Sequence, residues 1–245
     1  MDSTVDQSAQ TSRLTKIEAI AFDLDGTLYP NYRLNIRLIP FVLKEWRLLV
    51  AFDKARSTIR AQQEQTVPGT PAPPFPSFYQ TQSLYVAQLL GANPDQIKEK
   101  IDRLIYRGWE PFFKHIKLFS HVKETLTALR EAGFKMGLLS DFPPETKLEN
   151  LGIAGYWDAV LCSELCGALK PHPRSFQDLA AALNTAPERI LYVGNSYRYD
   201  VIGAKQAGMR TALITNPLTP RRRSPAPDFT FHDYRQLRDF VLQFH

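Results

Sequence analysis

The sequence predicts an α/β fold: a doubly wound parallel-sheet, Rossmann-like core with an inserted all-helical cap. Short apolar runs recur along the chain with helical segments between them, which is typical of a parallel sheet covered by helices on both faces. This alternation stops only between residues 30 and 117, where the chain has helical patterns and no strand pattern. The block lies between the first two expected strands, so we expect it to form the cap.

Five apolar runs are expected to form the strands of the core. They lack strict alternation of apolar and polar residues, as strands buried on both faces do. The runs are IEAIAF (17–22), KMGLLS (135–140), WDAVLC (157–162), RILYVG (189–194) and RTALIT (210–215). Helices are expected at 121–133, 143–152, 173–184, 199–208 and 234–245.

The block at 30–117 contains three expected helices, at 37–64, 79–90 and 94–107. A loop at 68–78 carries five prolines in eleven residues, which favour extended backbone. The expected domains are a disordered N-terminal tail (1–16), an α/β catalytic core (17–29 and 118–245) and a helical cap (30–117).

Composition narrows the classes of partner. The 245 residues are 44% hydrophobic, enough for a sizeable core. Thirty basic residues against 25 acidic ones give a net charge of +5, a mild excess that suits anionic small molecules as well as nucleic acid. The one basic tract, Arg221 to Arg223, is too short to argue for nucleic acid, so we expect no nucleic-acid partner.

Cysteine usage and the N-terminus indicate the compartment. The two cysteines, Cys162 and Cys166, have neither the spacing nor the partners of a zinc site. The N-terminal residues contain no apolar signal core, and charged residues interrupt the longest hydrophobic stretch of the cap. We therefore expect a cytoplasmic protein with no membrane partner; the sequence makes no prediction of oligomeric state.

Polar side chains follow four of the expected strands. In an open α/β sheet, ligands bind outside the carboxyl ends of the strands, so these side chains are candidates for one shared site. They are, in chain order, Asp23, Asp25, Ser140, Asp141, Lys170, Asn195 and Asp200.

This set of side chains fits phosphoryl transfer. Two carboxylates one residue apart, Asp23 and Asp25, can divide the work of nucleophile and proton carrier. Converging carboxylates repel each other unless a cation lies between them, and hard oxygen ligands suit Mg²⁺. Lys170 would neutralise a transferring anionic group, and the Ser140 hydroxyl would hold one of its oxygens.

Four segments resemble the ordered motifs of the haloacid dehalogenase-like superfamily, and the helical block lies where members of the helical-cap subclass carry their cap. The segments are AFDLDGTLY (21–29), GLLSD (137–141), GALKPHP (167–173) and VGNSYRYDVIGAKQAGM (193–209). The resemblance implies Asp23 as the nucleophile, Asp25 as the general acid and base, Ser140 as a phosphate-oxygen donor and Lys170 as the charge-neutralising lysine. The residues expected to bind substrate are Leu24, Ser140, Asp141 and Lys170.

The resemblance also implies Mg²⁺, held by the Asp23 carboxylate, the Asp25 main-chain carbonyl and an acid of the fourth motif. That motif usually opens with Gly-Asp, whereas here Asn195 follows the glycine and Asp200 is the only carboxylate. An amide oxygen can still ligate Mg²⁺ directly or through water, but the site loses one negative charge and its affinity for the cation should fall. His172 replaces the acid that is common in the third motif, and we expect it to be a surface loop residue.

The expected function is a Mg²⁺-dependent phosphatase that hydrolyses a small phosphorylated metabolite through an aspartyl phosphate on Asp23. A phosphomutase or phosphotransferase remains open because it shares the first half-reaction. A dehalogenase of the same fold is a further alternative, but Asp25 argues against it because a carbon–halogen leaving group needs no proton. A non-catalytic relative that binds a phosphorylated ligand is the alternative from another class.

Overall fold

A computed structural model describes residues 16–65, 77–216 and 224–243 of the chain. Apart from Lys16, the expected disordered tail lies outside the described residues. So do most of the proline-rich loop and the basic tract at 221–223.

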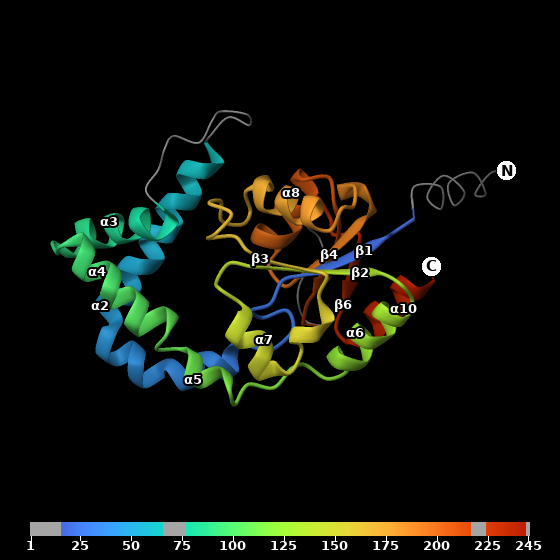
Figure 1. The fold of residues 1–245 in the computed structure, drawn as a ribbon, viewed down its shortest axis with the longest axis horizontal. Coiled ribbons are helices and arrows are strands. Elements are labelled where there is room, and N and C mark those ends of the chain that lie inside the picture. The colour runs from blue at the N-terminus through green and yellow to red at the C-terminus, as the bar shows by residue number, and fades with distance from the viewer. Residues whose placement is uncertain (1–15, 66–76, 217–223, 244–245) are drawn as a thin grey trace.

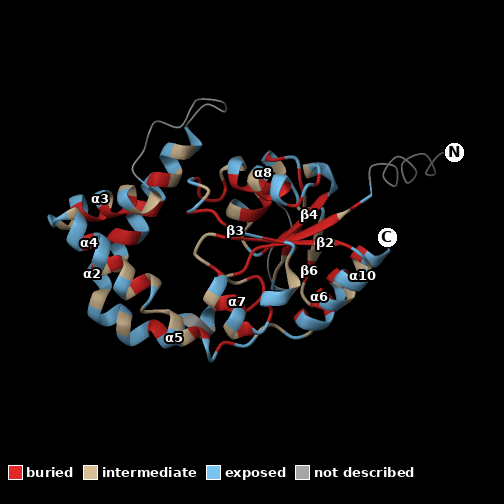
Figure 2. Ribbon diagram, in the orientation of Figure 1, coloured by how far each residue is buried: buried red, intermediate tan, exposed pale blue. Residues whose placement is uncertain are grey.

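Six parallel strands form one sheet in the order β3-β2-β1-β4-β5-β6. Because β1 lies between β2 and β4, the chain winds outward first on one side of β1 and then on the other, which confirms the doubly wound fold. The strands are β1 (Ala19–Phe22), β2 (Lys135–Ser140), β3 (Ala159–Cys162), β4 (Ile190–Gly194), β5 (Arg210–Ile214) and β6 (Phe229–Phe231). The central strands are buried along their whole length (Figure 2).

Helices cover both faces of the sheet (Figure 1). One face packs against α6 (Val122–Glu131), α7 (Glu145–Leu151) and α10 (Tyr234–Leu242). The other packs against α8 (Pro173–Ala182) and α9 (Gly203–Gln206). The strands alternate between these two cores, so that Phe22 faces the first and Ala21 the second. Short helical turns η2 (Ala154–Tyr156), η3 (Pro187–Arg189) and η4 (Tyr197–Ile202) complete the core.

Two local predictions about the core were incomplete. The edge strand β6 was not predicted, because only three residues, Phe229–Phe231, pair with β5. The single helix expected at 199–208 is the π-helical turn η4 followed by α9. It begins early because the Ser196 side chain accepts a hydrogen bond from the Tyr199 amide and caps the first turn.

The helical block between β1 and β2 packs around its own apolar cluster and lies to one side of the sheet (Figure 1). Its helices are α2 (Asn31–Glu64), α3 (Phe78–Leu90), α4 (Pro94–Ile101), the π-helical turn η1 (Asp102–Tyr106) and α5 (Glu110–Phe113). We call these the cap helices. The α2 helix begins six residues before the expected position, contains Pro40 and departs from helical geometry at Glu45. None of the described helices is long and apolar enough to cross a membrane.

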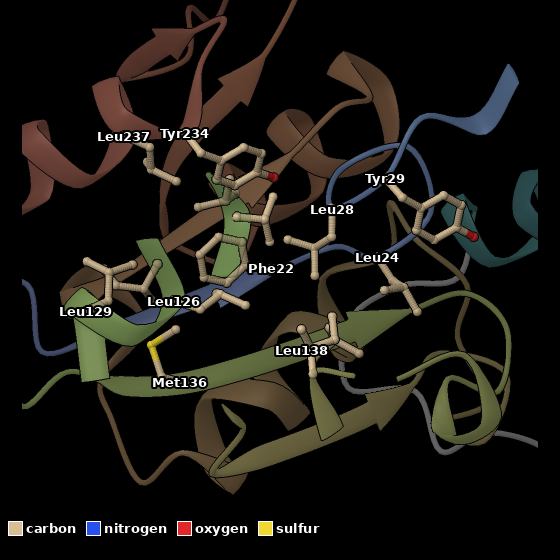
Figure 3. Packing of buried hydrophobic residues seen from close by; sticks show 14 of the residues in the cluster. Phe22, Leu24, Leu28, Tyr29, Leu126, Leu129, Met136, Leu138, Tyr234 and Leu237 are labelled. Carbon is tan, nitrogen blue, oxygen red and sulfur yellow. The ribbon is translucent and has the colours of Figure 1, made fainter. Parts of the chain in front are cut away.

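The loop after β1 turns tightly, with the amides of Thr27 and Leu28 both donating to the Leu24 carbonyl. Gly26 has a φ of +89°, a conformation that side chains other than glycine's disfavour. Leu24, Leu28 and Tyr29 lie among the buried side chains that pack with Phe22 (Figure 3). This apolar anchoring fixes the two carboxylates of the first motif, Asp23 and Asp25, which lie between the apolar residues.

Gly194 ends β4 where the Asp200 side chain crosses it. A Cβ at Gly194 would overlap the Cβ and Cγ atoms of Asp200. We expect Gly194→Ala to lower the free energy of unfolding by about 1–3 kcal/mol, the usual cost of overpacking. Denaturant unfolding measures this change.

Gly155→Ala is the matched control, because a Cβ there meets nothing within 4 Å. We expect its effect to stay within about 0.5 kcal/mol. If both variants were equally stable, the close packing of Asp200 against β4 would be wrong.

Candidate active site

Asp23 lies at the carboxyl end of β1 with its side chain almost fully buried. Its amide donates to the Val193 carbonyl at 2.9 Å, which continues the pairing of β1 with β4. Asp23 Oδ1 accepts a hydrogen bond from Lys170 Nζ at 2.6 Å, and Oδ2 accepts one from Thr27 Oγ1 at 2.7 Å. The backbone and both carboxylate oxygens are therefore fixed.

Lys170 lies in the loop between β3 and α8, and its ammonium group bridges two carboxylates. Nζ lies 2.6 Å from Asp23 Oδ1 and 2.9 Å from Asp200 Oδ1. It also donates to the Tyr192 hydroxyl at 3.3 Å. Burial by itself would lower the pKa of Lys170, but Asp200 and Asp23 together raise it well above its usual value. The bridge is therefore made by a charged ammonium.

The position of Asp200 is set by its own loop. Its Oδ2 accepts hydrogen bonds from the amides of Asn195 at 3.1 Å and Ser196 at 2.8 Å. The first motif, the lysine loop and the fourth motif thus meet at one buried point, although the three segments are far apart in the sequence. This convergence agrees with the expected arrangement at the strand ends.

Asp25 points to a different cation. Lys147 Nζ donates to both of its carboxylate oxygens, at 2.8 and 2.7 Å, and the Tyr29 hydroxyl donates to Oδ1. Ser140 Oγ lies 3.5 Å from Asp25 Oδ2. The two carboxylates of the first motif are therefore bound by separate lysines, Lys170 for Asp23 and Lys147 for Asp25.

Sequence reasoning missed Lys147. Its only signal was its place in the first turn of the helix that follows the second strand, and an exposed lysine is common there. In the structure Lys147 is buried, with Nζ 4.9 Å from the centre of the Phe113 ring and 5.4 Å from that of Phe142. A cation above two aromatic faces is stabilised by their quadrupoles.

Asp141, which was expected to bind substrate, directs its carboxylate toward the cap. Oδ2 accepts a hydrogen bond from Arg60 Nη2 of α2 at 2.7 Å, and Oδ1 accepts one from Ser163 Oγ at 2.6 Å. Burial alone would raise its pKa, but Lys170, Arg56 and Arg60 lower it to about 2. The Leu24 side chain is fully buried in the core, which leaves only its main chain to meet a substrate. Substrate binding by these two residues stays a prediction.

The C-terminal half of α2 is joined to the core by polar contacts that the sequence did not indicate. Buried Arg56 donates to the carboxylate of buried Glu164. Arg60 Nε donates to the Lys170 carbonyl at 3.0 Å, and Gln63 Nε2 donates to the Gly167 carbonyl at 2.9 Å. The cap helix thus binds the same loop that carries the buried lysine.

Two of the other oxygen donors expected for Mg²⁺, those of Asn195 and Asp200, lie near the Asp23 carboxylate. Thr27 Oγ1 lies 2.7 Å from Asp23 Oδ2 and 3.3 Å from Asn195 Oδ1, so the amide oxygen is beside the carboxylate. No group of three or more His, Cys, Asp or Glu side chains among the described residues is arranged to hold a metal. The expected set differs from such a cluster because it combines two carboxylates, Asp23 and Asp200, with an amide and a main-chain carbonyl.

The charges around Asp23 favour a second cation in addition to the Lys170 ammonium. Burial, together with repulsion from Asp200, raises the pKa of Asp23 to about 7 against the opposing effect of Lys170. A divalent cation bound beside Asp23 would offset both the burial and the repulsion, because it favours the ionised carboxylate. The residues present therefore fit a magnesium ion.

His172, which was expected to be a loop residue, begins α8, where its Nδ1 accepts a hydrogen bond from the Arg174 amide at 3.2 Å. Cys162 and Cys166 are free thiols. No hydrogen bond or ion pair among the described residues joins these three side chains to Asp23, Lys170 or Asp200.

A cavity of about 560 Å³ lies between the cap helices and α7. Asp25 and Lys147 line it from the core, whereas the other members of the buried cluster, Asp23, Lys170 and Asp200, do not. We call it the cap cavity. Its remaining lining comes from α2, α3, α4, η1, α5, α7 and the segments beside them.

Comparisons with known proteins give the family. A family model described as haloacid dehalogenase-like hydrolase matches residues 17–208. A glyceraldehyde 3-phosphate phosphatase of Methanopyrus kandleri is 29% identical over 235 residues, covering 93% of this chain and 98% of the relative. A phosphoglycolate phosphatase of Salmonella typhi is 27% identical and covers 83% of each chain. A phosphoserine phosphatase of Thermus thermophilus is 31% identical over 52% of this chain and 54% of the relative.

Solved structures share the fold at lower identity. A haloacid dehalogenase-like phosphatase from Thermococcus onnurineus superposes with a TM-score of 0.59 at 21% identity, covering 92% of this chain and 98% of the other. An L-2-haloacid dehalogenase of Xanthobacter autotrophicus gives 0.62 at 18% identity, with 92% and 98% covered. The motif order, the sheet topology and the family match agree: the chain belongs to the haloacid dehalogenase-like hydrolases, as the sequence predicted.

Proposed function

We propose that this hydrolase is a Mg²⁺-dependent phosphatase that cleaves a small phosphomonoester through an aspartyl phosphate on Asp23. One observation carries the proposal: neighbouring carboxylates, Asp23 and Asp25, are bound by different lysines and face different spaces. Such a division suits a nucleophile on one side and a proton carrier on the other. The named relatives, all phosphatases, support the same reaction class.

In the first half-reaction, an Asp23 carboxylate oxygen attacks phosphorus, and the bond from phosphorus to the ester oxygen breaks. Asp25 gives its proton to that leaving oxygen, which departs as the alcohol. Lys170, already within hydrogen-bonding distance of Asp23, offsets the charge of the transferring group. Ser140 Oγ, which lies 3.5 Å from Asp25 Oδ2, would donate to a phosphate oxygen.

In the second half-reaction, Asp25 accepts a proton from water as the water oxygen attacks the phosphorus of the aspartyl phosphate. The bond between phosphorus and the Asp23 oxygen breaks, and inorganic phosphate leaves. Lys147 and Tyr29 keep the Asp25 carboxylate in one orientation throughout. This orientation matters because proton transfer requires a heavy-atom distance of about 2.6–3.2 Å.

Mg²⁺ would be held by Asp23, the Asp25 carbonyl and Asp200, with Asn195 as a direct or water-bridged ligand. When bound, it would neutralise charge on the phosphate oxygens. A small phosphorylated metabolite as substrate and a cytoplasmic location are part of the same proposal. A dehalogenase would have no proton for Asp25 to transfer, so the contacts that Lys147 and Tyr29 make with this carboxylate would serve no step of that reaction.

Asp23→Asn removes the nucleophile and is expected to lower turnover by a factor of 10³ or more, because the covalent step is lost. The measurement is phosphate release from a panel of phosphomonoesters with and without Mg²⁺. Asp53→Asn, on α2 and away from the cluster, is the control. Undiminished activity in Asp23→Asn would show that Asp23 is not the nucleophile. If the wild-type protein bound a phosphomonoester and hydrolysed none of the panel, the non-catalytic relative would be favoured. Transfer to an added alcohol or sugar in place of water would favour the transferase alternative.

Lys147→Met is expected to lower kcat by roughly 10²-fold on alkyl phosphates, because Asp25 loses the donor that orients it. The loss should be much smaller for 4-nitrophenyl phosphate, whose leaving group needs little protonation. Lys205→Met, which removes a lysine paired with Asp228 elsewhere, is the control. An equal loss on both esters would show that Lys147 stabilises the fold and has no part in protonating the leaving group.

Asn195→Asp restores the acid that usually opens the fourth motif. We expect it to lower the Mg²⁺ concentration for half-maximal activity by about tenfold, because a carboxylate is a stronger ligand for a hard cation. The melting temperature provides a second readout: its rise on addition of Mg²⁺ should occur at lower Mg²⁺ concentration in the variant than in the wild type. Asn184→Asp adds the same charge at an exposed position after α8 and should leave both curves unchanged. If Asn195→Asp behaves like this control, Asn195 is not at the metal site.

A further inference from the structure

The cap cavity is on the leaving-group side of the site. Of the four residues expected to be catalytic, Asp25 lines it, whereas Asp23 and Lys170 belong to the buried cluster on the other side. In the proposed reaction Asp25 protonates the oxygen that leaves. The alcohol attached to that oxygen must then lie in the space from which the Asp25 carboxylate is reached, which is the cap cavity.

Five aromatic side chains line this cavity. They come from both sides: Tyr79, Tyr106, Trp109 and Phe113 from the cap helices and their connections, and Phe142 from the loop after β2. We call them the aromatic wall. The ring centres of Tyr106 and Trp109 lie 6.1 and 6.4 Å from that of Phe142.

The aromatic wall reaches the catalytic acid. Phe113 and Phe142 both lie against the Lys147 ammonium that binds Asp25. In addition, the indole N–H of Trp109 is buried and has no hydrogen-bond partner among the described residues. A ligand that brings an aromatic face and a hydrogen-bond acceptor would match both features.

The charges of the lining do not favour a second anion on the substrate. Four carboxylates line the cavity against three cations. Of the cations, Lys147 is bound by Asp25, and Arg107 is bound by Asp102. The lining carboxylates are Asp25, Asp102, Glu110 and Glu145, and the cations are Lys98, Arg107 and Lys147. With Asp25 protonated, as the first half-reaction requires, the lining has no net positive charge to attract a leaving group with its own carboxylate, such as that of phosphoserine or phosphoglycolate.

The volume of the cap cavity is also larger than a three-carbon ester would fill. A cavity of about 560 Å³ is within the range of roughly 300–1,000 Å³ that encloses ligands of drug size. A three-carbon alcohol would leave most of the aromatic wall in contact with water. A ring system would instead remove that apolar surface from water and gain the corresponding binding free energy.

We propose that the substrate is the phosphate monoester of an uncharged alcohol that carries an aromatic ring system, with the rings held in the cap cavity. This inference rests on the proposed function for the direction in which the alcohol leaves. It differs from the substrates in the names of the relatives, which are esters of two or three carbons.

The first experiment compares 2-phenylethyl phosphate with ethyl phosphate. Both are esters of primary alcohols of similar reactivity, so their ratio of kcat/KM reports how the ring is bound. We expect the phenyl ester to be favoured by roughly 10- to 100-fold, the gain for burying an aromatic side chain. Glyceraldehyde 3-phosphate, phosphoserine and phosphoglycolate complete the panel and are expected to be poorer than the phenyl ester.

Thr146→Trp places a large side chain on the lining of the cavity and should reduce the phenyl-to-ethyl ratio to near one. Glu149→Trp adds the same side chain to the same helix at an exposed position outside the lining, and should keep the wild-type ratio. A ratio that falls equally in both variants would contradict the placement of the ring.

Binding of 2-phenylethylphosphonate and ethylphosphonate, measured by calorimetry, does not depend on turnover. Tighter binding of the phenyl compound that is lost in Thr146→Trp supports the placement of the ring in the cap cavity, even if no ester is hydrolysed. Absence of hydrolysis would reject only the proposed phosphatase activity. Efficient hydrolysis of the short polar esters with no gain from the phenyl ring would overturn the substrate class and leave the phosphatase intact. Equal binding of the two phosphonates would overturn it as well.

Discussion

The site depends on one buried ammonium group, that of Lys170, which lies between the carboxylates of Asp23 and Asp200. Two buried carboxylates that contact the same ammonium group are close enough to repel each other. Without that cation, their negative charge would be uncompensated in a medium of low dielectric constant. The three loops that supply these residues leave different strands of the sheet. The parallel sheet brings their ends together, and the ion contacts then fix their side chains.

The separation of the two first-motif carboxylates follows from the apolar residues around them. Leu24 and Leu28 are buried in the core below the loop, and this anchoring sends Asp23 into the polar cluster and Asp25 toward the cap. Each carboxylate then meets its own lysine. The two carboxylates therefore have different surroundings, although only one residue separates them.

The sequence predicted the parts of the site that follow strands and missed those that come from helices. Asp23, Lys170 and Asp200 could be placed together because parallel strands share one carboxyl edge. Lys147 and Arg56 could not be placed in this way. Their positions depend on which face of a helix they occupy, and the helical pattern of the sequence does not show which loop that face contacts. The three-residue strand β6 was missed because it is too short for a periodic pattern.

The contacts of α2 connect the cap to the catalytic loops in a way that bears on specificity more than on stability. Arg60 binds both the Asp141 carboxylate, next to Ser140, and the Lys170 carbonyl, so the position of the cap helix and the positions of the loops after β2 and β3 are set together. Buried ion pairs such as that of Arg56 with Glu164 add little net stability, since desolvation offsets their attraction. Such a pair does restrict the position of the helix, because a shift of the guanidinium would leave the carboxylate buried without its partner. A cap held in one position by such contacts encloses a cavity of fixed shape. The proposed selection among alcohols requires such a fixed aromatic cavity beside Asp25.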